Sequence, residues 1–312
     1  MVENVIIIGS GPAAYSAALY CKSTNPLILR GGYIGANGPG GQLTTTTTVD
    51  NYPGFPKGVQ GPDLMDMMYK HADKHGIRQT METVENVKRE GDFFLVHTDE
   101  GVYETRSVIV ATGACAKRMY VPGTNDGELW QKGISACAVC DGFFFKDKIV
   151  CVIGGGDTAM VEAEHLSHIA KKVIVIHRRN EFRARPDNVE KVGKIPNVEY
   201  MTPFNLQSAH GEGKLEYIKL KNALNDKITD LKVDGMFFGI GHLPNTTFLK
   251  ENMSHIMDDL NYIVADSSMS TKEKGLFACG DVIDKVYRQA VTSAGMGCLA
   301  GIQAAEYIKN YD

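Results

Sequence analysis

The sequence predicts an α/β protein with two parallel-sheet units, because one short pattern occurs twice along its 312 residues. In each copy, an apolar run rich in β-branched residues is followed by a glycine-rich turn and then by an alanine-containing helix. A buried parallel strand that leads into a helix in this way is the unit of Rossmann-like, doubly wound sheets. A Cys-x-x-Cys pair, Cys137 and Cys140, lies between the two turns.

The composition is that of an ordinary globular chain, with 43% hydrophobic and 22% charged residues. The length is sufficient for two domains that each bury a core. A net charge of −4 leaves no basic surface for a polyanion, so we expect no nucleic-acid partner. Seven cysteines do not suit a secreted disulfide framework, and no apolar run approaches the ~20 residues that cross a bilayer. We therefore expect a cytoplasmic protein without a membrane partner.

The first copy of the pattern begins with the apolar strand at residues 5–8. Gly9, Gly11 and Ala14 follow at GxGxxA spacing. The first glycine permits a tight turn, the second lets the backbone approach a pyrophosphate, and the small third residue keeps the helix close to the strand. The helix N-terminus then faces the negative charge of a bound dinucleotide.

The residue after the next strand departs from this pattern. The strand at residues 26–29 should end near an acid that binds a ribose hydroxyl. Arg30 stands there instead, followed by Gly31 and Gly32. Either the ribose is held in another way, or this site tolerates additional negative charge.

The second copy consists of the strand at residues 148–153 and the turn at residues 154–159 (GGGDTA), with glycine and alanine at the same offsets. The next strand, at residues 172–176, is followed by basic residues where a carboxylate would select NAD. Arginine forms a fork with a 2′-phosphate, so this segment predicts NADPH. A solvated basic turn is the alternative interpretation.

The segments between these units predict further strands and loops. Residues 40–48 (GGQLTTTTT) form either a flexible polar loop or a set of hydrogen-bonding groups for a planar heteroaromatic ligand. Residues 93–96 and 103–105 are expected to form a small hairpin sheet, separate from a buried strand at residues 107–113. A helix is expected at residues 63–75, and a strand at residues 236–241 ends at a glycine, as the strand before Gly113 does.

The last segment contains a short strand that ends at Gly280 and Asp281, before a helix at residues 291–307. An acid at this place can bind a ribityl hydroxyl, and a helix N-terminus can stabilise negative charge on a flavin. The alternative is that Asp281 is only an N-cap, a role that aspartate commonly has.

The cysteine pair has three possible roles. Zinc requires about four ligands, but the other cysteines are scattered singly and His165 and His168 lie on an expected helix, so we expect no metal site. Stable structural disulfides are uncommon inside cells. A redox-active pair is favoured, since CxxC spacing can lower a thiol pKa and the adjacent Asp141 can exchange a proton with the pair.

Together these motifs resemble the low-molecular-weight thioredoxin reductases over essentially the whole chain and in the same order. Two positions depart from that family's usual residues: Arg30 replaces an acid, and Val139 replaces a threonine. The resemblance is carried by the first glycine turn, residues 40–48, residues 137–141, residues 177–179, residues 280–281 and residues 288–290.

The resemblance implies two Rossmann-like, three-layer domains, the second inserted into the first. Residues 1–116 and 246–312 would form a discontinuous FAD-binding domain, and residues 117–245 an NADPH-binding domain that carries the CxxC. Hydride would pass from NADPH to FAD, and two electrons would then pass to the Cys137–Cys140 disulfide. Cys140 would lie nearest the flavin, Cys137 would attack oxidised thioredoxin, and Asp141 would protonate a leaving thiolate. The resemblance also implies a homodimer.

The expected site residues form two cofactor sets in addition to Cys137, Cys140 and Asp141. The expected FAD set is Gly9, Ser10, Gly11, Pro12, Ala13, Gly41, Gln42, Leu43, Thr46, Asn51, Val84, Gly113, Gly280, Asp281, Arg288, Gln289 and Ala290. The expected NADPH set is Gly154, Gly155, Gly156, Asp157, Thr158, His177, Arg178, Arg179, Arg183, Ile240 and Gly241.

Three alternative functions remain open from the sequence. A ferredoxin- or flavodoxin-NADP reductase has similar architecture but lacks the CxxC. An FAD-dependent dithiol oxidase would pass electrons to oxygen and would not need the arginines after residue 176. A non-catalytic nucleotide-binding protein would be unaffected by replacing both cysteines.

Overall fold

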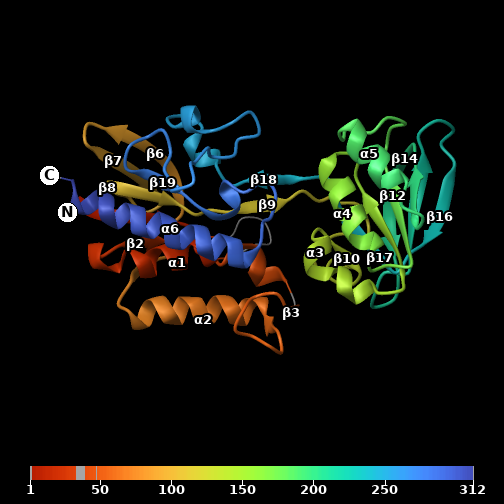
Figure 1. Ribbon diagram of the computed structural model, residues 1–312, viewed down its shortest axis with the longest axis horizontal. Coiled ribbons are helices and arrows are strands. Elements are labelled where there is room, and N and C mark those ends of the chain that lie inside the picture. Colours follow the sequence, from red (N-terminus) through yellow and green to blue (C-terminus); the bar gives the residue numbers. More distant parts are fainter. Residues whose placement is uncertain (1, 33–38, 47, 312) are drawn as a thin grey trace. The chain divides into compact units, whose positions relative to one another are not determined.

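The structure is a computed structural model that describes residues 2–32, 39–46 and 48–311 (Figure 1). The chain divides into two compact units, Met1–Cys115 with Leu243–Asp312, and Ala116–His242. The divisions expected from the sequence lie after residues 116 and 245. None of the described helices combines the length and apolarity that a bilayer crossing requires.

The first unit is built on one large sheet in the order β5-β2-β1-β8-β7-β6, with β19 also paired to β8. Strands β1, β2, β5, β8 and β19 are parallel, and β6 and β7 run antiparallel to their neighbours. The strands of this sheet are β1 (Val2–Ile8), β2 (Leu27–Leu29), β5 (Arg78–Thr80), β6 (Val84–Glu90), β7 (Phe93–Thr98), β8 (Val102–Val110) and β19 (Leu276–Ala278). Strands β3 (Thr48–Val49) and β4 (Val59–Gln60) pair with each other in a separate sheet. The helices are α1 (Pro12–Tyr20), α2 (Gly61–Lys74) and α6 (Ala290–Lys309).

The expectation of a separate hairpin sheet is wrong, because β8 is one nine-residue strand. Its first half pairs antiparallel with β7, with Leu95 opposite Glu104, and its second half pairs parallel with β19, with Phe277 opposite Ile109. Strand β1 pairs with the opposite edge of β8 from Glu104 to Val110, and so spans both halves. A single partner on that edge keeps both halves in one sheet.

The core of the first unit follows the two faces of β1. Ile7 packs in the cluster that contains α1 and α6, and Ile6 packs in the cluster on the other face. Successive strand residues point to opposite faces, so a strand buried on both sides is wholly apolar. Helix α6 lies directly against α1. The approach is so close that a Cβ at Gly297 would be 2.1 Å from Ala13 O.

The second unit contains a parallel sheet in the order β10-β17-β11-β12-β13 and an antiparallel sheet β14-β15-β16. Val150 and Val152 pack against α3, α4 and α5, whereas Cys151 and Ile153 pack against β14 and β15. The parallel sheet is therefore the middle layer of three. Its elements are β10 (Ile134–Ser135), α3 (Ala138–Asp141), β11 (Ile149–Ile153), α4 (Asp157–Ser167), β12 (Lys172–Ile176), α5 (Pro186–Gly193), β13 (Val198–Met201), β14 (Phe204–His210), β15 (Tyr217–Asn222), β16 (Ile228–Lys232) and β17 (Gly235–Phe238).

The chain crosses between the units twice, through β9 (Ala114–Ala116) and β18 (His242–Pro244), which pair with each other. Lys117 N donates to Gly241 O at 2.9 Å, and Asn245 N donates to Gly113 O at 3.0 Å. The two crossings are thus short.

Candidate nucleotide and dithiol sites

The glycine turn of the first unit leaves space for a ligand beside a free helix N-terminus. Gly9 has φ +124°, and a Cβ there would be 2.3 Å from Ala111 O, so the turn itself requires glycine. A Cβ at Gly11, by contrast, would meet no atom within 4 Å. Within the described residues no side chain caps α1, which begins at Pro12. The backbone N–H groups of this turn can bind a phosphate.

Ser10 joins this turn to two other segments. Its Oγ donates to Arg30 O and accepts from Gly40 N, both at 2.9 Å. The residues that follow form a 3₁₀ helix at Gly41–Thr45, from which Gln42 Nε2 donates to Ala114 O at 2.6 Å. The GGQL segment is thereby held beside the first turn.

Asp281 is a half-buried acid in the 3₁₀ turn Gly280–Val282 that follows β19. Ser293 Oγ donates to Asp281 Oδ1 at 2.8 Å. Burial raises the pKa of Asp281 to about 6, against the opposing effects of Ser293 and Arg288. The N-cap of α6 is Gln289 rather than Asp281, so the alternative role as a simple cap is wrong. A half-buried carboxyl that is not a cap is suited to accept a hydrogen bond from a ligand hydroxyl.

The second unit repeats the arrangement of the first turn. A Cβ at Gly154 would be 2.3 Å from Gly239 O, whereas a Cβ at Gly156 would meet nothing within 4 Å. No described side chain caps α4, whose N-cap is Gly156. Gly155 O accepts from Arg183 N at 2.6 Å and from Ala184 N at 3.0 Å, which brings the basic segment to the turn.

The basic segment of the second unit combines a buried histidine with exposed arginines. His177 is buried, and its Nε2 has no hydrogen-bond partner within the described part of the chain. Burial, followed by the charge of Arg178, lowers the pKa of His177. Arg178, Arg179 and Arg183 are exposed and form no ion pair with any described carboxylate. Such cations are available to an anionic ligand.

Arg185 differs from these arginines because acids already surround it. Its Nε lies 3.9 Å from Asp157 Oδ1 and 3.8 Å from Asp187 Oδ1. Asp157 Oδ1 also accepts from Arg185 N at 3.1 Å and from Asn188 Nδ2 at 2.7 Å, with the Asn188 bond the main cause of its lowered pKa. Asp157 therefore holds the basic segment in place.

The cysteine pair forms a disulfide at the start of α3. The Cα atoms of Cys137 and Cys140 lie 5.3 Å apart, and Cys140 N donates to Cys137 Sγ at 3.2 Å. Val139, Phe143 and Phe144 are 50%, 43% and 46% exposed, and the two phenylalanine rings are in contact. The disulfide is thus flanked by exposed apolar side chains.

Asp141 lies buried immediately after the pair. Its Oδ2 accepts from Ser135 Oγ, which in turn accepts from Cys137 N at 3.1 Å. Burial raises the pKa of Asp141, and the Ser135 hydrogen bond opposes that rise. A carboxyl with a raised pKa beside a disulfide can hold a proton for thiol exchange.

Comparison with known proteins identifies the family. The family model described as pyridine nucleotide-disulphide oxidoreductase matches residues 3–297. The chain belongs to this family.

Its relatives are thioredoxin reductases, so the resemblance that the sequence motifs indicate is confirmed. Thioredoxin reductase of Chlamydia pneumoniae is 42% identical and covers 98% of this chain and 99% of its own. NADPH-dependent thioredoxin reductase 3 of Arabidopsis thaliana is 41% identical over 99% of this chain and 59% of its own length. The structure of Streptococcus pyogenes thioredoxin reductase has a TM-score of 0.90, with 35% identity and 99% coverage of both chains. The predicted two-domain α/β fold class is confirmed with it.

Several residues expected by analogy with thioredoxin reductases are brought together across long stretches of sequence. Asn51 Nδ2 donates to Gln289 Oε1 at 3.0 Å, and a Cβ at Gly280 would be 2.9 Å from the Cβ of Ala13. Val84 is different, because its side chain packs in the core of the first unit and can present only backbone. The remaining expected residues lie in the turns and element ends already described or beside them: Leu43, Thr46, Gly113, Arg288, Ala290, Thr158, Ile240 and Gly241.

Ser135 is a further residue of this site that the sequence motifs do not indicate. It lies in β10, two residues before Cys137, and is 4% exposed. The available signal was a hydroxyl in a short strand next to the pair. Its significance depends on a bond to Asp141 that spacing alone does not show.

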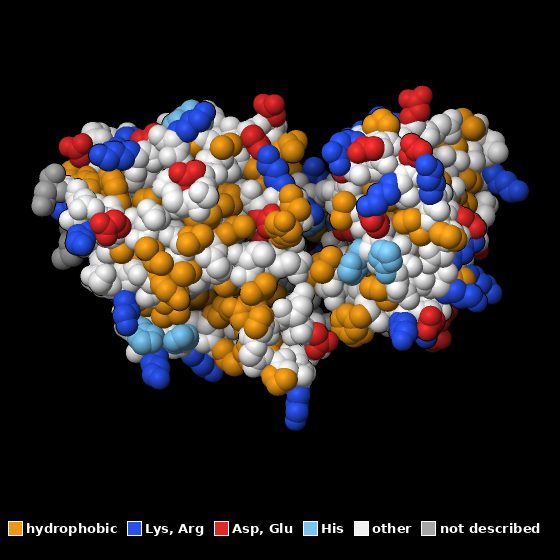
Figure 2. Space-filling view, in the orientation of Figure 1, with side chains coloured by type: hydrophobic (Ala, Val, Ile, Leu, Met, Phe, Trp, Pro, Cys, Tyr) orange, Lys and Arg blue, Asp and Glu red, His pale blue; other side chains and the backbone are white. Residues whose placement is uncertain are grey.

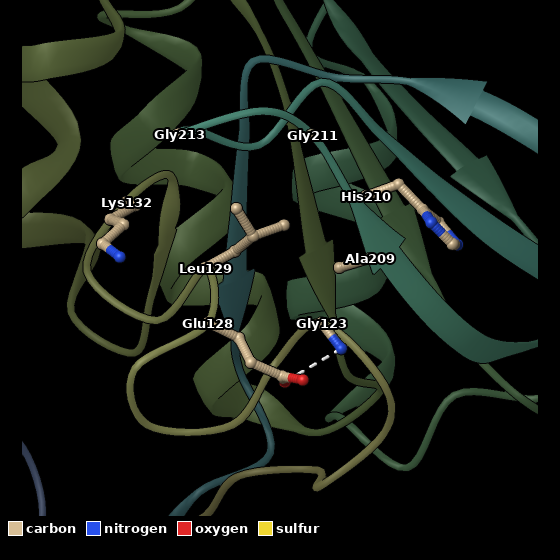
Figure 3. Close-up of a pocket in the computed structure, with 8 residues that line it drawn as sticks. All are labelled: Gly123, Glu128, Leu129, Lys132, Ala209, His210, Gly211 and Gly213. Atoms are coloured by element: carbon tan, nitrogen blue, oxygen red, sulfur yellow. Dashed lines mark hydrogen bonds between the residues drawn. The ribbon is translucent and has the colours of Figure 1, made fainter.

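A cavity of about 350 Å³ lies elsewhere in the second unit (Figure 3). Its carboxylate, Glu128, already accepts from Gly123 N at 3.0 Å and Asn125 N at 2.8 Å. None of its lining residues belongs to the glycine turn, the arginine group or the cysteine pair: Gly123, Glu128, Leu129, Lys132, Ala209, His210, Gly211 and Gly213. We assign it no role in the reaction.

Proposed function

We infer that this chain is a thioredoxin-disulfide reductase that binds FAD in its first unit and NADPH in its second. The observation that carries this inference is the Cys137–Cys140 disulfide beside buried Asp141, in a chain with two glycine turns whose following helices no described side chain caps. The near full-length similarity to thioredoxin reductases supports the same activity.

The two sets of residues fit the two cofactors. In the first unit, the space at Gly11 suits a pyrophosphate and the Asp281 carboxyl suits a ribityl hydroxyl. In the second, the space at Gly156 suits a pyrophosphate, and Arg178 and Arg179 suit a 2′-phosphate. When bound, NADPH supplies a hydride, and FAD supplies the chemistry that converts it into the electron pair needed to reduce a disulfide.

Once the pair is reduced, Cys137 acts as the attacking thiolate. The Cys140 N–H that points at its sulfur stabilises negative charge there. Cys137 Sγ bonds to one sulfur of the substrate disulfide, and the substrate S–S bond breaks. The departing substrate thiolate takes the proton held by Asp141. The Asp141 carboxylate then takes the proton of the Cys140 thiol, and the Cys140 thiolate attacks Cys137 Sγ, which restores the Cys137–Cys140 disulfide and releases the second substrate thiolate.

The substrate is an oxidised thioredoxin. A disulfide flanked by the exposed side chains of Val139, Phe143 and Phe144 suits a protein with an apolar surface around its own disulfide. A small polar disulfide would gain nothing from these contacts. The five free cysteines, Cys21, Cys115, Cys151, Cys279 and Cys298, suit a reducing compartment, which supports a cytoplasmic location.

A second copy of the chain covers the exposed apolar face of α6. Val291, Leu299 and Ile302 are 42%, 44% and 45% exposed at helical spacing, and Tyr20 on α1 is 56% exposed. Figure 2 shows hydrophobic side chains gathered over these helices. Exposed apolar faces of this kind mark interfaces. Leu299→Asp with Ile302→Asp should convert a dimer to a monomer in light scattering, whereas Leu224→Asp, at an exposed turn, should not.

The decisive test is NADPH consumption by the purified holoenzyme with and without oxidised thioredoxin. We expect fast consumption only with thioredoxin, accompanied by two new thiols on each thioredoxin reduced. Equal consumption without it would identify oxygen as the acceptor and favour a dithiol oxidase. Consumption that persists after both cysteines are replaced would exclude the disulfide from the electron path.

A further inference from the structure

We propose that Ser135 is a positioning residue that sets the protonation of Asp141 and couples it to the backbone at Cys137. The proposal rests on the reductase function given above. It concerns a residue whose hydroxyl lies between the attacking cysteine and the acid but touches no substrate sulfur.

The geometry determines the direction of the hydrogen bond. Ser135 Oγ accepts from Cys137 N at 3.1 Å, and this N–H occupies one lone pair of the hydroxyl. The hydroxyl proton is then directed to Asp141 Oδ2. Ser135 and Asp141 are 4% and 7% exposed, so water does not compete effectively for either bond.

This bond opposes the effect of burial on Asp141. A hydroxyl that donates to a carboxylate stabilises the ionised form, whereas a buried site stabilises the protonated form. Among the described residues, these two influences alone shift the pKa of Asp141. The acid is therefore kept strong enough to release its proton and weak enough to recover it.

Neighbouring elements bring few charges to this site. Strand β17, which pairs with β10, contributes apolar Met236 and Phe237. From α4, His165 lies near Gly142, and burial together with His168 lowers the pKa of His165. The hydrogen bond from the Ser135 hydroxyl is thus the polar contact that opposes the effect of burial on Asp141.

The chemical consequence is a proton that moves with the state of the cysteine pair. When a substrate thiolate leaves, Asp141 gives up its proton and becomes the better acceptor of the Ser135 hydroxyl. The same hydroxyl holds Cys137 N, so the backbone next to the attacking sulfur stays in place while the charge on Asp141 changes.

The test compares Ser135→Ala and Ser135→Thr holoenzymes with the unaltered protein. The first readout is the infrared C=O band of the protonated Asp141 carboxyl as a function of pH, assigned by its loss in Asp141→Asn. We expect the midpoint of this band to rise by about one pH unit in Ser135→Ala, the scale of one hydrogen bond to a carboxylate. Ser135→Thr keeps the hydroxyl and should restore the original midpoint.

The second readout is the pH profile of disulfide reduction, whose alkaline limb should shift with the band and should not shift when Ser135→Ala is added to Asp141→Asn. If Ser135→Ala does not fold, Ser135→Cys replaces it in the test. Its thiol is a weak hydrogen-bond donor of similar size, so both readouts should shift in the same direction. An unchanged midpoint in Ser135→Ala, or a Thr variant that behaves like Ala, would overturn the proposal. Because the infrared titration requires no thioredoxin, its result is independent of whether the proposed substrate is correct.

Discussion

Gly9 in the first unit and Gly154 in the second lie against equivalent carbonyls: a Cβ would come within 2.3 Å of Ala111 O and within 2.3 Å of Gly239 O. Gly11 and Gly156 both face open space. In each turn, one glycine is thus required by the fold and another is required only if a ligand approaches the backbone. This difference is the strongest physical argument that both turns are binding sites.

The surroundings of the two turns differ in the charge that follows the second strand. In the first unit, the half-buried guanidinium of Arg30 lies over the Tyr69 ring at 4.5 Å. In the second, Arg178 and Arg179 are exposed and available to a 2′-phosphate. The common backbone suits a pyrophosphate, and we propose that the side chains after β2 and β12 determine which dinucleotide each unit prefers.

Replacing Cys137 by serine should have the largest effect, because it separates the chemistry of the two units. The flavin should still be reduced by NADPH, while thioredoxin reduction should fall by at least about 1,000-fold, as expected for loss of a nucleophile. Stopped-flow flavin absorbance and thioredoxin turnover measure the two steps. Retained turnover would show that Cys137 does not attack the substrate.

Gly11→Val and Gly156→Val test whether the open glycines serve ligands. Because neither Cβ would meet protein atoms, both variants should fold. Gly11→Val should no longer bind FAD, and Gly156→Val should bind NADPH with about 100-fold lower affinity. Flavin content and NADPH titration report each effect. If both cofactors bind normally, the glycines serve another purpose.

Asp281→Asn tests the half-buried acid of the first unit. The pKa of Asp281 is raised to about 6, so the unfolded chain loses this proton first and the apoprotein loses stability as pH rises from about 4 to about 6. The variant should therefore be more stable than the unaltered apoprotein at pH 7.5, by on the order of 3 kcal/mol, and equal to it near pH 4. Urea unfolding at both pH values measures this. Equal stabilisation at both would rule out an ionisation effect.

Arg178→Ala combined with Arg179→Ala should raise KM for NADPH by about tenfold or more, the scale of one charge-assisted hydrogen bond, and leave KM for NADH almost unchanged. Arg185→Ala is the matched control, because Arg185 already lies beside Asp157 and Asp187. If both dinucleotides weaken equally, the arginines do not recognise the 2′-phosphate.

Arg30→Gln should give the smallest change, a two- to fivefold loss of FAD affinity, about that of an exposed ion pair. Since the expected contribution is electrostatic, the affinity of the unaltered protein should fall more steeply with salt than that of the variant. Fluorescence titration of apoprotein with FAD at two salt concentrations measures both. Identical salt dependence would place Arg30 out of reach of the cofactor.

The sequence by itself determined the features that depend on neighbouring residues. Both glycine turns, the CxxC with its adjacent acid and the arginines after β12 were recognisable, because turn geometry and helix starts are set over a few residues. Their combination was sufficient to identify the family.

Only the tertiary structure decided which groups are buried and what they contact. Asn51 meets Gln289 across 238 residues, and the half-buried Asp281 accepts from Ser293. Arg185 lies beside two carboxylates, whereas Arg183 forms no ion pair with a described carboxylate. Ser135 contacts Asp141 because β10 is buried beside it. Burial and pairing arise from segments distant in the chain, and they set the pKa values that local spacing cannot show.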